Sequence, residues 1–171
     1  MKPLLITALA ALFLMACDTT APRLTGAPAV TATIDGVSFR STETDTQLVA
    51  GLNPADDRMG MQASTAGQAR FDQIGFSLKP FRGTGQYPLQ ITNSLTATAY
   101  WFPDSRNSTT PPVYNGFGGP HDYVYVTRYD RAHHIVEGVF GFDAIDYVTG
   151  AVKHVRNGHF RGALAPPQPL P

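Results

Sequence analysis

An aromatic cluster in the middle of the chain is the feature of this sequence with the clearest chemistry. Three consecutive rings at 100–102 end a segment rich in strand-forming residues, and two more rings follow in a stretch rich in Pro and Gly. Flat aromatic faces beside polar donors stack on sugars or enclose apolar ligands. The sequence therefore predicts a binding site for a glycan, a peptide or an apolar ligand. Its candidate residues are Tyr100, Trp101, Arg106, Asn107, Tyr114 and Phe117.

The same rings have a second interpretation. The stretch from 103 to 120 contains four Pro and three Gly in eighteen residues, which is longer than most connections between strands. A segment of this length can fold over the end of a β domain, and its rings would then complete the hydrophobic core. In either case we expect any ligand to contact the segment from Tyr100 to His121, because loops held by rigid strands present binding residues.

The N-terminal segment carries a pattern for covalent lipid attachment. Lys2 precedes twelve uncharged residues at 4–15, which are too few to span a bilayer and are typical of a signal peptide. They end in Leu14-Met15-Ala16-Cys17, which resembles a bacterial lipobox, and Cys17 is the only Cys of the chain. The resemblance implies cleavage before Cys17, a diacylglycerol on its thiol and an acyl group on its freed amine.

The lipobox divides the chain into four expected parts. They are a signal peptide at 1–16, a flexible tether at 17–28 that starts with the lipidated Cys17, a β domain at 29–164 and a Pro-rich tail at 165–171. We therefore expect an extracytoplasmic protein of the bacterial cell envelope that is anchored to a membrane through Cys17. The pattern does not distinguish the inner from the outer membrane.

Composition excludes some partners and favours one fold class. Thirteen Lys and Arg balance thirteen Asp and Glu, so no excess positive charge attracts nucleic acid, and we predict no nucleic-acid partner. Charged residues are 15% of the chain against roughly 25% in ordinary domains, whereas Gly and Pro are abundant. This balance favours an all-β domain with many turns over a bundle of long helices.

Catalytic motifs are incomplete or absent. The chain has no G-x-S-x-G, H-E-x-x-H or P-loop pattern, and its acidic pairs do not match an EF-hand, so we predict no catalytic residue, metal or cofactor. We interpret His121 and Asp122 as a solvated loop pair. The five His residues, whose spacing does not favour a zinc or copper site, are His121, His133, His134, His154 and His159. An extracytoplasmic hydrolase that uses scattered carboxylate and His groups remains the alternative to a binding or envelope-structural module.

Alternating apolar residues and turn signals run through the chain from residue 29 onward. Asp35-Gly36 predicts a tight hairpin, and Asn157-Gly158 predicts either a second tight turn or a bulge in one long last strand. We predict one two-layer antiparallel β-sandwich of about eight to ten strands, or alternatively a small lipocalin-like barrel. The expected strands cover 30–34, 37–39, 48–52, 59–63, 74–78, 95–102, 123–129, 135–143 and 151–164.

Three short segments carry a family resemblance. They are Ala32-Thr33-Ile34-Asp35-Gly36-Val37-Ser38-Phe39, the strand at 135–144 (IVEGVFGFDA) and the element at 156–160 (RNGHF). Together with the lipobox they resemble a group of small bacterial lipoproteins that is common in the Bacteroidetes and their neighbours. The resemblance implies a single antiparallel β domain and an envelope location, and it implies no particular activity.

Overall fold

The structure is a computed structural model that describes residues 29–42, 49–53, 57–65, 72–91, 96–103, 112–116, 118–133 and 135–165. Several sequence-based predictions fall outside these residues. They concern the signal peptide, the tether with Cys17, the tail beyond residue 165 and the candidate site residues Arg106, Asn107 and Phe117.

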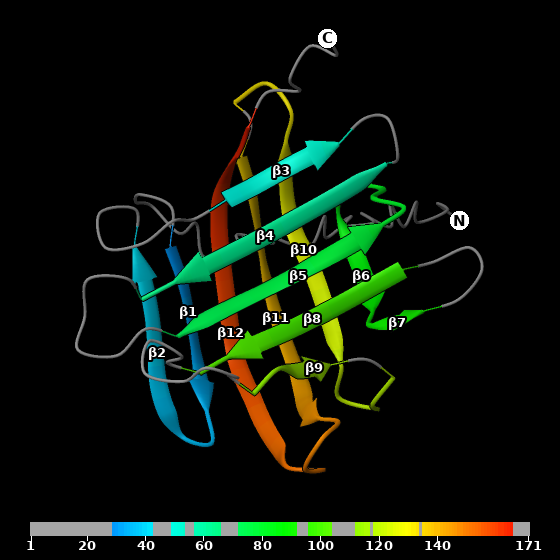
Figure 1. Cartoon of the computed structure of the whole chain (residues 1–171). Helices are drawn as coiled ribbons and strands as arrows, with labels where there is room; N and C mark the ends of the chain where they lie inside the picture. Colours follow the sequence, from blue (N-terminus) through cyan, green and yellow to red (C-terminus); the bar gives the residue numbers. More distant parts are fainter. Residues whose placement is uncertain are drawn as a thin grey trace, which may run out of the picture.

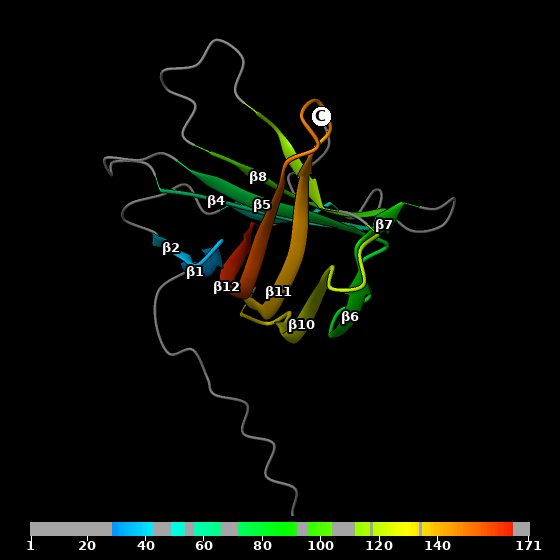
Figure 2. The same ribbon diagram turned by 90° about the horizontal axis from the view of Figure 1, so that it is seen from below.

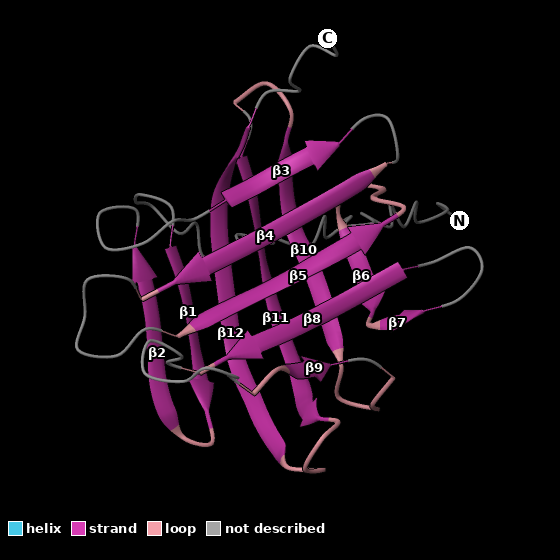
Figure 3. Cartoon of the chain, viewed as in Figure 1, coloured by secondary structure: helices cyan, strands magenta, loops and turns pink. Residues whose placement is uncertain are grey.

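β-strands dominate the described residues, which include no helix, so the predicted all-β class is confirmed (Figure 3). None of these residues belongs to a helix with the length and apolar character of a membrane span. The described residues form twelve strands, more than the eight to ten predicted; nine have five or more residues, and β6, β7 and β9 are shorter. The strands are β1 (Ala29–Ile34), β2 (Val37–Thr42), β3 (Val49–Asn53), β4 (Arg58–Ser64), β5 (Gln73–Lys79), β6 (Gly85–Pro88), β7 (Gln90–Ile91), β8 (Thr96–Phe102), β9 (Tyr114–Gly116), β10 (Tyr123–Asp130), β11 (Ile135–Asp146) and β12 (Val152–Ala165).

The strands form two layers that cross at a steep angle (Figure 1). In the back layer the order is β2, β1, β12, β11, β10 and β6, and in the front layer it is β3, β4, β5, β8 and β9, with β7 also beside β8. Hydrogen bonds join the layers at two corners, where β12 pairs in parallel with β3 and where β9 pairs with β11. The molecule is therefore a flattened barrel with extra strands at two edges, which combines features of the predicted sandwich and of the alternative barrel.

The first hairpin forms as the sequence predicts. Asp35 and Gly36 have φ angles of 48° and 80°, the positive values that a type I′ turn requires at both central positions. The turn pairs Ile34 with Val37 and sets the register of β1 and β2.

The last strand contains a bulge at Asn157-Gly158, one of the two alternatives left open by the sequence. Asn157 has a φ of 52°, and the four residues of β12 from Val155 to Gly158 oppose three residues of β11, from Phe140 to Phe142. A bulge of this kind exchanges the two faces of a strand. Val155 faces the core before the bulge, and Gly158 and Phe160 face it after the bulge. All three residues are buried.

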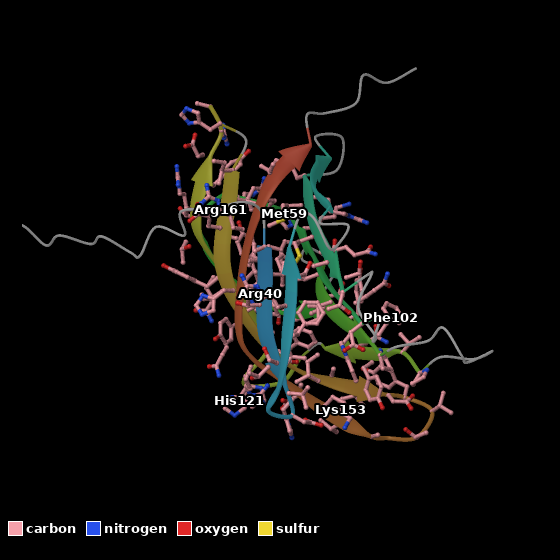
Figure 4. All side chains as sticks on the ribbon, turned by 90° about the vertical axis from the view of Figure 1, so that its left-hand side faces the viewer. Arg40, Met59, Phe102, His121, Lys153 and Arg161 are labelled. Carbon is pink, nitrogen blue, oxygen red and sulfur yellow. The ribbon has the colours of Figure 1, made fainter. Side chains whose placement is uncertain are left out.

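The core lies between the two layers and is centred on phenylalanine rings. Phe76 of the front layer meets Phe160 and Phe140 of the back layer, with ring centroids 4.9 Å and 5.9 Å apart. Figure 4 views the layers from the side, with Met59 between them and Phe102 at the front layer. This packing fixes the layers against each other and holds the strand ends at which candidate sites lie.

Candidate functional site

The predicted aromatic cluster is divided between two faces of the front layer. Side chains alternate along a strand, so neighbouring rings of β8 point in opposite directions. Trp101 faces the core and is 3% exposed, whereas Tyr100 and Phe102 lie on the outer face with ring centroids 4.9 Å apart. The predicted rings that the structure describes therefore do not share one surface.

Trp101 and Tyr114 pack together inside the barrel. The two residues are cross-strand partners on β8 and β9, and their ring centroids are 4.9 Å apart. Tyr114 is 9% exposed, and the Nε1 atom of Trp101 is buried without a hydrogen-bond partner. Their burial favours a role in the core over direct contact with a ligand.

Part of the long Pro/Gly segment forms strand β9 and extends the front layer. β9 pairs with β8 on one side and with the end of β11 on the other. Because Tyr114 points inward, its neighbour Asn115 points outward, between Tyr100 of β8 and Ile145 of β11. The described end of the segment thus places one predicted ring, Tyr100, beside a polar side chain that the sequence analysis did not single out.

A hollow of about 600 Å³ opens beside β9, and we call it the corner hollow. One wall comes from the residues at the start of β9, and the other comes from the turn that joins β11 to β12, which projects beyond the front layer (Figure 2). Three of its apolar side chains are exposed, namely Val113 at 40%, Tyr147 at 59% and Val148 at 94%. The lining residues are Pro112, Val113, Asn115, Asp146, Tyr147, Val148 and Thr149.

Asp146 fixes the shape of the turn that walls the hollow. Its carboxylate accepts hydrogen bonds from the Thr149 hydroxyl and from the backbone N–H of Val148, and these bonds lower the pKa of Asp146 below its ordinary value. The N–H of Gly150 donates to the Asp146 carbonyl at 2.7 Å, and Gly150 has a φ of 73°. These bonds hold Tyr147 and Val148 outward, so their exposure follows from a well-defined turn.

Charged side chains link the strands of the back layer on its outer face. Glu137 is 5% exposed and lies between Arg128 at 3.2 Å and Arg161 at 3.5 Å, one on each neighbouring strand. Arg128 also contacts Asp130, whose carboxylate accepts a hydrogen bond from the His133 side chain, which lowers the pKa of Asp130 to about 2. This network joins three strands by ion pairs.

A second carboxylate–histidine pair lies at the other end of β11. Nδ1 of His154 is 2.8 Å from Oδ1 of Asp143, and Arg156 contacts the same carboxylate. A carboxylate can orient a histidine for acid–base catalysis, and the described partners of the two paired imidazoles are carboxylates and a guanidinium. Because Asp143 belongs to β11 and His154 and Arg156 belong to β12, these groups join the two strands.

The interpretation of Asp122 as a solvated loop residue is wrong. Asp122 is 7% exposed, and its carboxylate accepts hydrogen bonds from the N–H groups of Gly119 and Asp143. It anchors the loop before β10 to β11, while His121 beside it is exposed. Among the described residues, no group of three His, Cys, Asp or Glu side chains is arranged to hold a metal ion.

Comparison of the chain with protein families, curated proteins and solved structures finds no match in any of the three. In the corner hollow, concavity and exposed apolar side chains occur together with a few polar groups, which is typical of ligand-binding sites. The sequence analysis missed its Tyr147 and Val148, although two apolar residues between Asp146 and Thr149-Gly150 are a detectable signal.

Proposed function

We propose that this chain is a ligand-binding module of the bacterial cell envelope, anchored to a membrane by a lipid on Cys17, with the corner hollow as its binding site. One observation carries the proposal, namely that Tyr147 and Val148 are held exposed at the rim of a hollow of about 600 Å³. Apolar surface in contact with water costs roughly 25 cal/mol per Å², so a ligand that covers these side chains gains binding free energy.

The lining indicates the chemistry of a suitable ligand. Pro112, Val113, Tyr147 and Val148 supply apolar contacts, and Asn115 supplies an amide that can donate or accept a hydrogen bond. The carboxylate of Asp146 is ionised at neutral pH and is already engaged by the turn. These groups favour an uncharged, partly apolar ligand over an anion.

The sequence supports the envelope location. The expected signal peptide leads into a lipobox-like motif that ends at Cys17, and a tether is expected to follow it. The three segments that resemble Bacteroidetes-type lipoproteins correspond to the β1–β2 hairpin, to β11 and to β12, which are neighbours in the back layer. We infer that the chain is a lipoprotein of this kind.

Replacing Val148 by Asp is expected to weaken ligand uptake at least tenfold while leaving stability nearly unchanged. The new carboxylate would have to lose water when a ligand covers the rim, whereas Val148 is 94% exposed and contributes little to folding. N-Phenyl-1-naphthylamine, a neutral dye whose fluorescence rises in apolar surroundings, measures the uptake. Its saturable fluorescence increase with the wild-type chain should be lost in Val148→Asp.

Val37→Asp is the matched control for this experiment. Val37 is another exposed valine, at 57%, but it lies at the β1–β2 turn and is not one of the residues that line the hollow. Dye binding should be unchanged in this variant. Equal dye affinity in Val148→Asp and in the wild type would exclude the corner hollow as the site.

Replacing Cys17 by Ser is expected to release the protein from membranes or to leave its precursor uncut. Serine lacks the thiol that accepts diacylglycerol, and Cys17 is the only Cys of the chain. Fractionation of cells that express each form, with the mass of the protein measured in each fraction, tests this. A Cys17→Ser protein that stays membrane-bound at its mature mass would refute the lipid anchor.

A further inference from the structure

Among the residues that the structure describes, the outward side chains of the front layer next to the corner hollow carry no charge. The charged residues of the described strands in this layer lie at its other end. They are Arg58 at the start of β4 and Lys79 at the end of β5. We call the surface around Tyr100 the Tyr100 platform. Its outward residues are Gly60, Gln62, Gln73, Gly75, Ser77, Thr98, Tyr100, Phe102 and Asn115.

The ring of Tyr100 extends across the neighbouring strand, where Gly75 leaves room for it. Gly75 is the cross-strand partner of Tyr100, and a Cβ atom on Gly75 would lie 2.3 Å from both Cζ and the hydroxyl oxygen of Tyr100. The tip of the ring therefore rests on the neighbouring strand, and Tyr100 as a whole stays partly exposed. Partial burial raises the pKa of Tyr100, so its hydroxyl is protonated and can donate a hydrogen bond at neutral pH.

Amide side chains flank this ring in a single cross-strand row. The row runs from Gln62 through Gly75 and Tyr100 to Asn115, and neighbouring strands are spaced about 4.8 Å apart. A sugar ring has an apolar face of C–H groups and a rim of hydroxyls. An aromatic face with amides on both sides matches these two features, since amides both donate and accept hydrogen bonds.

The outward side chains of the platform that the structure describes are all neutral, which favours one class of ligand. A charged ligand would lose hydration there, and none of these described side chains supplies an opposite charge to replace it. A purely apolar ligand would cover Gln62 and Asn115 and leave their amides without hydrogen bonds. A neutral polyhydroxylated ligand avoids both costs.

We propose that the Tyr100 platform binds a neutral saccharide, with one sugar ring stacked on Tyr100 and its hydroxyls hydrogen-bonded to Gln62 and Asn115. This inference rests on the proposed function and names its ligand class, because the platform and the corner hollow share Asn115. A saccharide that carries an apolar substituent would fill both, with its sugar on the platform and its substituent in the hollow.

Isothermal titration of the full chain with maltohexaose, cellohexaose and N-acetylated chitohexaose tests the proposal. We expect at least one of these to bind, with affinity reduced at least tenfold in Tyr100→Ala and within about threefold of wild type in Tyr100→Phe, which keeps the ring. Gly75→Ala should also weaken binding, because the new methyl group displaces the flexible Tyr100 side chain from the sheet. Thermal unfolding of each variant checks that it is folded.

Tyr125→Ala provides the matched control. Tyr125 is 44% exposed but lies on β10 of the opposite layer, so its loss should leave saccharide affinity unchanged. The proposal is overturned if none of the three saccharides binds, or if Tyr100→Ala and Gly75→Ala bind like the wild type. If the chain takes up the naphthylamine dye in a way that depends on Val148 but binds none of the saccharides, the platform is refuted and the corner hollow is not. If the wild-type chain binds neither the dye nor a saccharide, the proposed function is refuted as well.

Discussion

Replacing Trp101 by Ala is expected to lower the free energy of unfolding by about 3–5 kcal/mol, the usual cost of truncating a large buried ring. The indole is 3% exposed, and its cross-strand neighbours are Ile74 of β5 and Tyr114 of β9. Truncation would leave a cavity, and β9, with three residues, is too short to close over it. Urea denaturation followed by far-ultraviolet circular dichroism measures this loss in the wild type and the variant.

Trp101→Phe is the control that separates the ring from its polar atom. The buried Nε1 of Trp101 has no hydrogen-bond partner, and an unsatisfied buried donor costs about 1–3 kcal/mol. Phe removes that donor and retains an aromatic ring, so we expect a loss smaller than half that of Trp101→Ala. If Trp101→Ala stays within about 1 kcal/mol of the wild type but abolishes dye uptake, Trp101 contacts ligand, as one interpretation of the sequence proposes.

Local patterns predict most of the strands because their signals lie within a few residues of each other. The Asp35-Gly36 turn and the alternation of Ile74, Phe76 and Leu78 require only a tight turn and a period of two. Pairing between distant strands depends instead on contacts that no local pattern contains. The parallel pairing of Leu164 with Ala50, which joins the two layers, is of this second kind.

The candidate site was less predictable, for two physical reasons. Alternation along a strand separates Tyr100 from Trp101, and this rule could be applied to the sequence once β8 was recognised as a strand. The exposure of Tyr147 and Val148 has a different origin, because it depends on the hydrogen bonds of Asp146 within the turn. Their location beside Asn115 depends further on the pairing of β9 with β11, which brings together segments about thirty residues apart.

Gly138→Ala is expected to destabilise the protein by about 3 kcal/mol, the upper end of the usual cost of overpacking. A Cβ atom at this position would lie 2.3 Å from the backbone oxygen of Tyr125 and 2.5 Å from two ring carbons of Phe160. The backbone oxygen belongs to β10, so it can move only if the pairing between β10 and β11 is distorted. Thermal and urea denaturation of the variant measure the loss.

Gly60→Ala is the matched control. It makes the same substitution in another strand, but we expect it not to destabilise the protein. The nearest atom to a Cβ on Gly60 is the backbone oxygen of Phe76 at 3.9 Å, which is an ordinary contact distance. Alanine also restricts the unfolded chain, so Gly60→Ala should be neutral or should stabilise the fold by about 0.4–1 kcal/mol. If both variants lose the same free energy of unfolding, strand glycines are needed here for their backbone conformation. The close approach of Phe160 and β10 to Gly138 would then not explain the effect.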